Sequence, residues 1–473
     1  MNNILRIKKK KKMEDEKNPR KVRLSRCYRW FLFFIMVTIE GVMNVSSGLL
    51  SSATKEVKKS LNMNDAKFGS FGTANSFGRI ISSTLFGMLN QKMSRKWSTT
   101  LGIGLHAIFI FCFQITNNAN ILIFVRGLHG FTQMPPSIYV PVWVSQFAIR
   151  KYRTIQITSI QLFQTTGKCI GYFLNMYFGL ENWKTGFFIE GLYLLFCTFC
   201  CLITSEDYFS RTLYRPKLTD EDENKDRVTC TVYQEEELKK EEKAKKGNFF
   251  SDLMILSCHS LFMMSMLCRV ILHGLNTCMH FWLADFMRNV IHEQNQFKIT
   301  ICYSIICFSG PAGGILTNAI LKPLIGNYDS RKASWPLVFI QLTASIFAVS
   351  IGFMRTTISC TVATILFLIF NSSALPLLQG ILISCVDPAL SATGFAITNV
   401  LTQVLTSGTT PLLYGIINDR FKEQYPWMAM VCIMSLEFIA VPLLSILAIL
   451  RNKKFDEEEK LKEKEQGEEL VDK

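Results

Sequence analysis

Residues 120–172 read NILIFVRGLHGFTQMPPSIYVPVWVSQFAIRKYRTIQITSIQLFQTTGKCIGY. This stretch predicts two apolar helices joined by a short basic turn at residues 150–153. Each helix carries one cation in an otherwise apolar context, Arg126 in the first and Lys168 in the second. A charge near the middle of a bilayer costs about 3 kcal/mol on insertion scales, so such residues usually face a bundle interior or a watery cavity. The hairpin therefore predicts a membrane protein with a polar path between its helices.

The composition of the whole chain agrees with this prediction. The chain has 473 residues, of which 49% are hydrophobic, and its mean hydropathy is +0.22. Charged residues gather in the first 29 residues, in residues 206–252, in a few short turns and after Arg451. Between these segments lie long stretches with almost no charge, as expected for a chain embedded in lipid.

The net charge of +15 and the run Lys8 to Lys12 do not lead us to predict a nucleic-acid partner. Positive charge beside membrane spans is what the positive-inside rule expects. The first apolar stretch begins near Tyr28 and is too long for the apolar core of a cleavable leader. We therefore expect it to be retained as the first membrane span.

Twelve apolar stretches are long enough to cross a bilayer, which takes roughly 20 residues. They lie at residues 28–52, 66–89, 97–116, 120–147, 153–178, 184–204, 253–286, 296–322, 334–354, 357–384, 390–417 and 426–450. We predict an all-α membrane protein with twelve transmembrane helices in two six-helix bundles. The predicted parts are a basic tail (1–27), a first bundle (28–205), a central loop (206–252), a second bundle (253–450) and a charged tail (451–473).

Basic residues set the predicted orientation. If both termini are cytoplasmic, the turns that share their side are those rich in lysine and arginine, at residues 92–96, 150–153 and 322–332. The turn after the first span departs from this pattern, since it holds Lys55, Lys58, Lys59 and Lys67. We predict cytoplasmic termini, in either the plasma membrane or an internal membrane.

Two charged segments are predicted to lie outside the bilayer. Residues 235–246, EEELKKEEKAKK, alternate in charge and predict a solvated helix along the membrane surface. Residues 456–469, DEEEKLKEKEQGEE, predict a disordered or weakly helical tail.

Twelve spans, a six-plus-six split and a long charged middle loop resemble the major facilitator superfamily. That family marks the turn between its second and third helices with a glycine, an acidic residue and a basic pair. Here Gly87, Arg95 and Lys96 match, while the acidic position falls on Asn90 or Gln91. The resemblance implies that this turn is a gate, in which Arg95 or Lys96 pairs across the cytoplasmic helix ends.

Four short segments are similar to the spinster-like branch of that superfamily, which transports lysolipids and sphingolipids. They are VRG at 125–127 followed by Gly130, FWLA at 281–284, GPAGGILT at 310–317, and PLLYGIINDR at 411–420. The last segment makes Asp419 and Arg420 gating candidates. In this branch a glutamate tied to proton coupling follows the helix-4 arginine by seven residues. This chain has Gln133 there, so another acid would have to carry any coupling.

Polar residues inside the spans recur at helical spacing and therefore share helix faces. Glu40 precedes Asn44 by four residues, and we predict that it either takes up protons or forms an ion pair with Arg126. The planar guanidinium of Arg126 suits a phosphate or a carboxylate. The predicted substrate-binding residues are Glu40, Asn44, Arg126, Gln133, Gln161, Gln164, Lys168, His273, His280, Asn371, Gln379, Asn399 and Gln403.

Further charged residues were identified inside or near the ends of the spans. Asp285 and Arg288 are predicted to gate or cap the seventh span, while Arg79, Glu190 and Arg269 have no predicted partner. We find no catalytic motif, predict no enzyme, cofactor or metal site, and expect no disulfide framework from the fifteen cysteines.

These observations predict a monomeric transporter that works by alternating access and contacts membrane lipids. The resemblance implies a lysophospholipid or a sphingoid-type lipid as the substrate, with proton coupling left open. A sugar, an organic anion or an amino acid is the alternative substrate. A receptor or sensor that binds its ligand without moving it is the alternative of another class.

Overall fold

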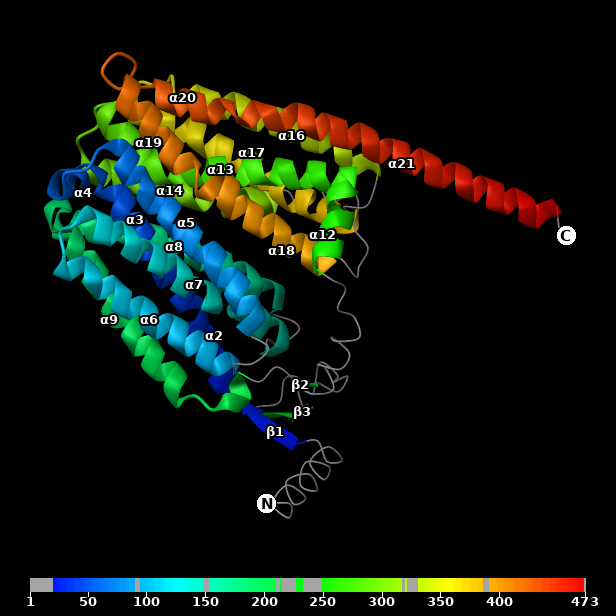
Figure 1. Cartoon of the computed structure of the whole chain (residues 1–473), viewed down its shortest axis with the longest axis horizontal. Coiled ribbons are helices and arrows are strands. Elements are labelled where there is room, and N and C mark those ends of the chain that lie inside the picture. The colour runs from blue at the N-terminus through cyan, green and yellow to red at the C-terminus, as the bar shows by residue number, and fades with distance from the viewer. Residues whose placement is uncertain are drawn as a thin grey trace.

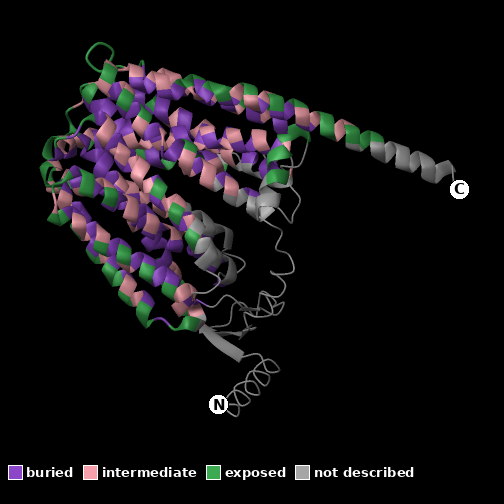
Figure 2. Ribbon diagram, in the orientation of Figure 1, coloured by how far each residue is buried: buried purple, intermediate pink, exposed green. Residues whose placement is uncertain are grey.

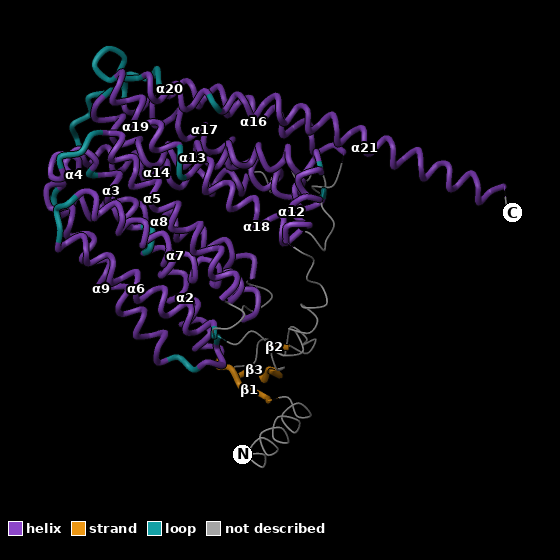
Figure 3. Tube along the Cα trace, in the orientation of Figure 1, coloured by secondary structure: helices purple, strands orange, loops and turns teal. Residues whose placement is uncertain are grey.

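The computed structural model describes residues 20–89, 94–147, 153–209, 213–214, 227–232, 249–316, 320, 331–385 and 391–471. Helices make up most of this part of the chain, and the strands are confined to three short segments (Figure 3). Long helices lie side by side in two groups that follow each other along the sequence (Figure 1). Buried residues run along the helices of both groups, and exposed residues gather on the loops (Figure 2).

The first half contains the helices of the first six predicted spans. They are α2 (Arg26–Val42), α3 (Val45–Ser52), α4 (Thr54–Leu61), α5 (Asp65–Leu89), α6 (Arg95–Ile115), α7 (Ala119–Phe147), α8 (Arg153–Phe178) and α9 (Trp183–Ile203). Two short 3-10 helices, η2 (Leu180–Asn182) and η3 (Glu206–Tyr208), flank α9. Together α2 and α3 form the first span, and α4 lies in the turn that follows it.

The second half contains the helices of the other six spans. They are α12 (Phe249–Cys258), α13 (Ser260–Asn289), α14 (Gln296–Leu316), α16 (Ser334–Ile351), α17 (Thr357–Ser384), α18 (Ser391–Thr402), the π-helix η6 (Gln403–Ser407), α19 (Thr410–Phe421), α20 (Met428–Ser435) and α21 (Glu437–Val471), with the 3-10 helix η5 (Arg331–Ala333) before α16. The predicted all-α fold with two helix bundles is confirmed.

The first span is interrupted between α2 and α3. A main-chain carbonyl freed inside a bilayer needs a protein partner, because lipid offers no donor. The side-chain amide of Asn44 donates to the carbonyl oxygen of Glu40 at 2.8 Å, and that of Gln133 donates to the carbonyl oxygen of Met43 at 3.4 Å. These two amides therefore stabilise the interruption.

Among the described residues, nine helical segments are long and apolar enough to cross a membrane. Among the long helices, those that fall short of this standard are α5, α7 and α8, all in the first half. These three helices carry Arg79, Arg126 and Lys168, respectively. Polar residues of this kind lower the mean hydropathy of a helix below the value that identifies a membrane span. The same three helices position much of the site described below.

Close helix contacts in the first half depend on glycine. A Cβ atom at Gly48 would lie 2.0 Å from the carbonyl oxygen of Lys168, and one at Gly78 would lie 1.8 Å from that of Gly127. Both distances are shorter than any real Cβ contact, so only glycine fits. Small residues at such crossings let α3 approach α8, and α5 approach α7, closely enough to pack without a hydrophobic driving force.

The predicted basic tail and the predicted central loop are not separate segments, because they share a small sheet. The strands β1 (Arg20–Ser25), β3 (Arg227–Val232) and β2 (Leu213–Tyr214) are antiparallel and follow one another in that order. The β-branched residues of RVTCTV favour such pairing. The predicted surface helix at residues 235–246 lies outside the described residues.

The predicted disordered or weakly helical C-terminal tail is instead part of a helix. The last helix, α21, continues without interruption to Val471 and extends beyond the bundle (Figure 1). Arg331 of η5 contacts Asp456 at 2.7 Å and Glu459 at 3.7 Å. These ion pairs join the helix to the turn before α16.

Candidate functional site

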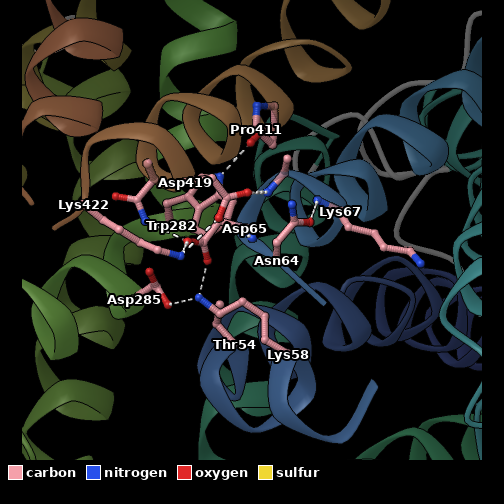
Figure 4. Close-up of polar contacts among 12 residues, drawn as sticks. Thr54, Lys58, Asn64, Asp65, Lys67, Trp282, Asp285, Pro411, Asp419 and Lys422 are labelled. Atoms are coloured by element: carbon pink, nitrogen blue, oxygen red, sulfur yellow. Dashed lines mark hydrogen bonds and ion pairs between the residues drawn. The ribbon is translucent and has the colours of Figure 1, made fainter. Parts of the chain in front are cut away.

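The two halves meet at the end of the molecule that holds α4, away from both chain termini (Figure 1). A network of charged side chains joins the halves there (Figure 4). Its centre is Asp65, the first residue of α5. Oδ1 of Asp65 lies 2.5 Å from Nζ of Lys58, and Oδ2 lies 2.9 Å from Nζ of Lys422 in the second half. Oδ2 also accepts a hydrogen bond from the Asn418 amide at 3.2 Å.

Lys58 extends the network to a second carboxylate of the second half. Its Nζ atom lies 3.1 Å from Oδ1 of Asp285 on α13. The side chains of Asp65 and Asp285 are 3% and 2% exposed, so each carboxylate depends on this ammonium group for compensation. Lys58 thus holds one acid from each half.

A third carboxylate, that of Asp419 on α19, caps the start of α5. Oδ1 of Asp419 accepts from the main-chain nitrogen of Asp65 at 3.0 Å, and Oδ2 accepts from that of Ala66 at 2.8 Å. The first N–H groups of a helix have no partner within the helix and carry its positive partial charge. The second half therefore caps the first two N–H groups of α5, while Asn64 of the first half accepts from the main-chain nitrogen of Lys67 at 2.9 Å.

Beneath the charges lies a layer of close apolar contacts between the halves. The ring of Phe68 meets those of Phe281 and Trp282, with centroids 5.2 and 5.5 Å apart. A Cβ atom at Gly69 would lie 2.5 Å from the carbonyl oxygen of Pro411. The hydroxyl of Thr73 donates to the carbonyl oxygen of Gly408 at 2.5 Å. This layer brings α5 and the eleventh span together.

The charges of this network shift one another's pKa. Burial raises the pKa of Asp65, but Lys58 and Lys422 outweigh it and hold that pKa below its usual 3.8. Burial lowers the pKa of Lys58, but Asp285 and Asp65 outweigh it and hold that pKa above its usual 10.5. A pocket of about 300 Å³ opens beside these residues, and its lining includes two acids and two lysines. The pocket therefore carries no net charge.

Deeper between the halves lies a second polar group that is rich in cations. It comprises Arg79 of α5, Lys168 of α8 and His273 of α13. Lys168 interacts electrostatically with Arg79, and His273 interacts with both. All three side chains are partly exposed. Within the described part of the chain, neither Arg79 nor Lys168 forms a hydrogen bond or salt bridge, so both cations can receive an anionic ligand.

Glu40 is the acid beside these cations. It is fully buried, and its Oε2 accepts hydrogen bonds from Gln164 at 2.7 Å and from Ser137 at 3.1 Å. Its electrostatic partner is Arg79. The alternative prediction that it forms an ion pair with Arg126 is wrong, because the Arg126 guanidinium donates to the hydroxyls of Ser46 and Ser47 and forms no salt bridge with Glu40 among the described residues.

Arg126 instead belongs to the interior of the first half. Its Nη1 donates to the hydroxyl of Ser46 at 2.8 Å and its Nη2 to that of Ser47 at 2.9 Å. It also interacts electrostatically with Glu190 of α9. These contacts occupy the guanidinium, which leaves Arg79 and Lys168 as the cations that face the second half.

The other predicted binding residues have diverse surroundings. Asn371 is buried and donates to the carbonyl oxygen of Leu272 at 3.2 Å, as expected of a structural amide. Nδ1 of His280 lies 3.9 Å from Sγ of Cys307, beside the contact between α8 and α14. Gln403 lies in the π-helix and is partly exposed. The side chains of Gln161, Gln379 and Asn399 are outside the described set.

The predicted gating residues separate into two groups. Asp419 lies in the contact between the halves, whereas Arg420 is exposed beside the ring of Phe421. Arg95 lies over the ring of Tyr139, and Lys96 donates to the carbonyl oxygen of Leu202 at 2.8 Å.

These two contacts of Arg95 and Lys96 lie within the first half. Gly87 lies near the end of α5, beside residues outside the described ranges. Of the two residues predicted to gate or cap the seventh span, Asp285 binds Lys58, and Arg288 donates to Gln296.

Sequence analysis did not identify Asp65, Asn418 or Lys422 as site residues, although it noted Lys58. The available signal was the lysine-rich turn after the first span, which departs from the positive-inside pattern. One of those lysines, Lys58, forms a salt bridge with each of two buried acids.

Solved structures of other transporters share this fold. A bacterial homologue of the human lysosomal transporter Spinster, inward-facing and unoccupied, has a TM-score of 0.70 at 13% identity and covers 91% of this chain and 99% of its own. An occupied inward-facing structure of a bacterial Spinster homologue has a TM-score of 0.63 at 12% identity and covers 90% of this chain and 97% of its own. The nucleoside transporter NupG has a TM-score of 0.60 at 14% identity and covers 90% of this chain and 99% of its own. Such identities show a common fold.

The comparison with curated proteins found no sequence match. The sequence pattern of the Major Facilitator Superfamily, in contrast, matches residues 30–411, which is most of the chain. The match runs from the first predicted span into the eleventh and includes most of the residues that join the two halves. The chain belongs to the Major Facilitator Superfamily of multi-pass membrane transporters.

Proposed function

We propose that this protein moves a lysophospholipid or a related amphiphile with an anionic head group across its membrane by alternating access. The observation that carries the proposal is the pair of cations, Arg79 and Lys168, which lies between the halves and forms no salt bridge with the described acids, although Glu40 interacts electrostatically with Arg79. A phosphate placed there would interact with both cations and with His273 of the other half. A ligand held in this way would be released when the halves part.

The Asp65 network supports the alternating-access part of the proposal. In the described state the halves are joined at the α4 end by contacts that a rocking motion would break as a group. The similarity to a bacterial Spinster homologue in an inward-facing state fits closure at one end. Opening that end would leave Asp65 and Asp285 accessible to water, which would compensate their charge.

Glu40 is the residue that we propose to carry a coupling proton. It is the acid nearest the cation pair, and its carboxyl interacts electrostatically with Arg79. Protonation of Glu40 would strengthen the net positive charge that faces the substrate, and loss of the proton would weaken it. Proton binding and anion binding at this site would therefore favour each other.

The test is uptake of radiolabelled lysophosphatidylcholine into proteoliposomes that contain the purified protein, with and without a pH gradient that is acidic outside. We expect saturable uptake that falls at least about tenfold in Lys168→Met and loses its gradient dependence in Glu40→Gln. The matched control is Lys184→Met, a lysine at the start of α9 that contacts Thr116 and Asn117 of the same half.

Other outcomes would identify the alternatives. Uptake of a sugar, a nucleoside or an organic anion without uptake of the lysolipid would contradict the substrate class and keep the transport mechanism. Saturable binding of the lysolipid without accumulation would contradict transport and indicate a receptor or sensor. If Lys168→Met leaves uptake unchanged, the substrate binds at a place other than the cation pair.

A further inference from the structure

Two cysteines from different halves lie in contact beside the deep group of cations. Cys169 belongs to α8 of the first half and Cys307 to α14 of the second, and their thiols interact with each other. Both are free thiols, and they are 4% and 2% exposed. The neighbouring rings of Tyr172 and Tyr303 stack with centroids 3.7 Å apart and pack α8 against α14 at this level. A bond between the two sulfur atoms would join the halves covalently.

Two basic side chains lie beside this thiol pair. Nδ1 of His280, on α13, lies 3.9 Å from Sγ of Cys307. Lys168, the residue before Cys169, interacts electrostatically with both thiols. The thiolate is the reactive form of cysteine, and a neighbouring lysine or histidine favours it. His280 can therefore accept the proton of Cys307, while the ammonium group of Lys168 compensates the charge that develops on sulfur.

A second pair of cysteines, within the second half, has different neighbours. Cys302 of α14 interacts with Cys360 of α17, which is fully buried. The thiol of Cys360 also hydrogen-bonds the side chain of Thr364, and among the described residues no cation acts on it. Proximity of two thiols therefore recurs in this protein, whereas the basic neighbours distinguish the pair that spans the halves.

The thiol pair between the halves lies on the same side of the interface as the Asp65 network. Further along α8, the amide of Asn175 donates to the hydroxyl of Ser52 at 2.6 Å, immediately before α4. The segment of α8 that follows Cys169 thus runs toward the α4 end. Parting of the halves at that end would separate α8 from α14, which a disulfide would prevent.

We propose that Cys169 and Cys307 form a site of reversible oxidation by hydrogen peroxide, and that their disulfide arrests the transporter with the α4 end closed. The Cys307 thiolate attacks one oxygen of the peroxide, the O–O bond breaks, and the proton held by His280 leaves with the other oxygen as water. The thiol of Cys169 then attacks the sulfenic acid on Cys307. The S–O bond breaks, the S–S bond forms and a second water is released. The two thiols together lose two electrons, and the peroxide gains them.

The burial of the thiol pair selects a small oxidant. Hydrogen peroxide is uncharged and only slightly larger than water. Lys168 and Ser304, whose side chains contact the Cys169 thiol, are both partly exposed and mark the way in. Glutathione disulfide is a charged peptide and cannot reach sulfur atoms that are 4% and 2% exposed. The site should therefore respond to peroxide and not to the glutathione couple.

The first test detects the modification itself. Purified full-length protein is treated with hydrogen peroxide, its remaining thiols are alkylated, and its peptides are identified by mass spectrometry. We expect the disulfide between Cys169 and Cys307 at a dose that leaves Cys302 and Cys360 reduced. Its formation should be at least about tenfold slower in His280→Phe, because the proton acceptor is removed. Glutathione disulfide should give no cross-link.

The second test measures the arrest without reference to any substrate, so its failure would leave the proposed function untouched. A membrane-impermeant maleimide labels Asn289→Cys, in the pocket beside the Asp65 network, after the peroxide has been removed. Among the native cysteines only Cys169 and Cys307 are kept, and labelling is normalised to the thiol that reacts after denaturation. Oxidation should slow labelling at least about tenfold, because a covalent link removes the open state. Dithiothreitol should restore the rate.

The matched control for the arrest is Cys307→Ser in the same background, whose labelling the peroxide should leave unchanged. Absence of the disulfide, equal oxidation of Cys302 and Cys360, or an unchanged rate in His280→Phe would overturn the oxidation site. Labelling at the full rate in the oxidised protein would overturn the arrest.

Discussion

The carboxylate of Asp419 accepts a hydrogen bond from the main-chain nitrogen of Asp65 at 3.0 Å, although 354 residues separate them in the sequence. A helix of the first half is thus capped by a residue of the second. A cap of this kind contributes about 1 kcal/mol, with a range of roughly 0.5–2 kcal/mol. Because the halves must separate for the cap to be lost, this energy belongs to the closed state of the α4 end and not to either bundle alone.

Asp419→Ala should therefore open the α4 end without unfolding the protein. A loss of about 1 kcal/mol shifts the equilibrium about fivefold toward the open state. We would measure the rate at which a membrane-impermeant maleimide labels Asn289→Cys, which lies in the pocket beside the network, in a background whose reactive native cysteines are replaced. Arg420→Ala is the control, since its side chain is exposed; equal rates in the two variants would show that the cap does not hold the halves together.

Lys58→Met should lower the apparent melting temperature more than Lys422→Met. Lys58 is 16% exposed and compensates two buried acids, so its removal is expected to cost about 3 kcal/mol or more. Lys422 is 46% exposed, and its pair with Asp65 is expected to contribute about 0–1 kcal/mol.

Adding Asp285→Asn to Lys58→Met should restore part of the loss, because one unpaired acid is removed. Thermal denaturation of the three purified variants provides the measurement. An equal effect of the two lysine variants would contradict the central role of Lys58.

The ion pair between Asp65 and Lys58 should be insensitive to pH across the physiological range. The pKa of Asp65 is lowered, so its contribution is complete above the usual value of 3.8 and is lost only as the pH falls through the lower folded value. The pKa of Lys58 is raised, so its contribution is complete below the usual value of 10.5 and is lost only above it.

Labelling of Asn289→Cys, normalised to a free thiol, should therefore not vary between about pH 5.5 and 8.5. A marked change in that window would show that another group controls the α4 end. A pH dependence of uptake without a change in labelling would instead point to a group on the transport path, for which Glu40 is our candidate.

The native thiols of Cys169 and Cys307 should cross-link the two halves. Cys169 lies on α8 and interacts with Cys307 on α14, close to the stacked rings of Tyr172 and Tyr303. Copper phenanthroline with oxygen removes two electrons and two protons from the thiols and forms one disulfide.

The cross-linked protein should lose substrate uptake and regain it with dithiothreitol, because transport requires α8 and α14 to separate. Peptide mass spectrometry identifies the bond. Cys307→Ser should be unaffected by the same treatment, and full uptake by the cross-linked protein would contradict motion at this contact.

The sequence is sufficient to predict an all-α membrane protein with two helix bundles, because burial in lipid requires long apolar stretches. It also predicts which polar residues share a helix face. Contacts between the halves could not be predicted in this way. Asp65 and Lys422 are far apart in sequence, and helical periodicity within one span carries no information about a partner in another.

Some local features were missed for a related reason. A search for apolar stretches has no means of identifying the strand pairing of residues 20–25 with residues 227–232. It also treats an interrupted span such as α2 and α3 as continuous, because the amides of Asn44 and Gln133 that stabilise the interruption look like ordinary polar residues until their partners are known.

The antiparallel pairing of β1 with β3 has a consequence for synthesis. The first strand precedes the first span, and the third follows the sixth, so their pairing ties together the beginning and the end of one bundle. As soon as residue 232 has left the ribosome, the first bundle can close into a ring before any helix of the second bundle exists. The first six spans can thus be fastened together before the second six are complete.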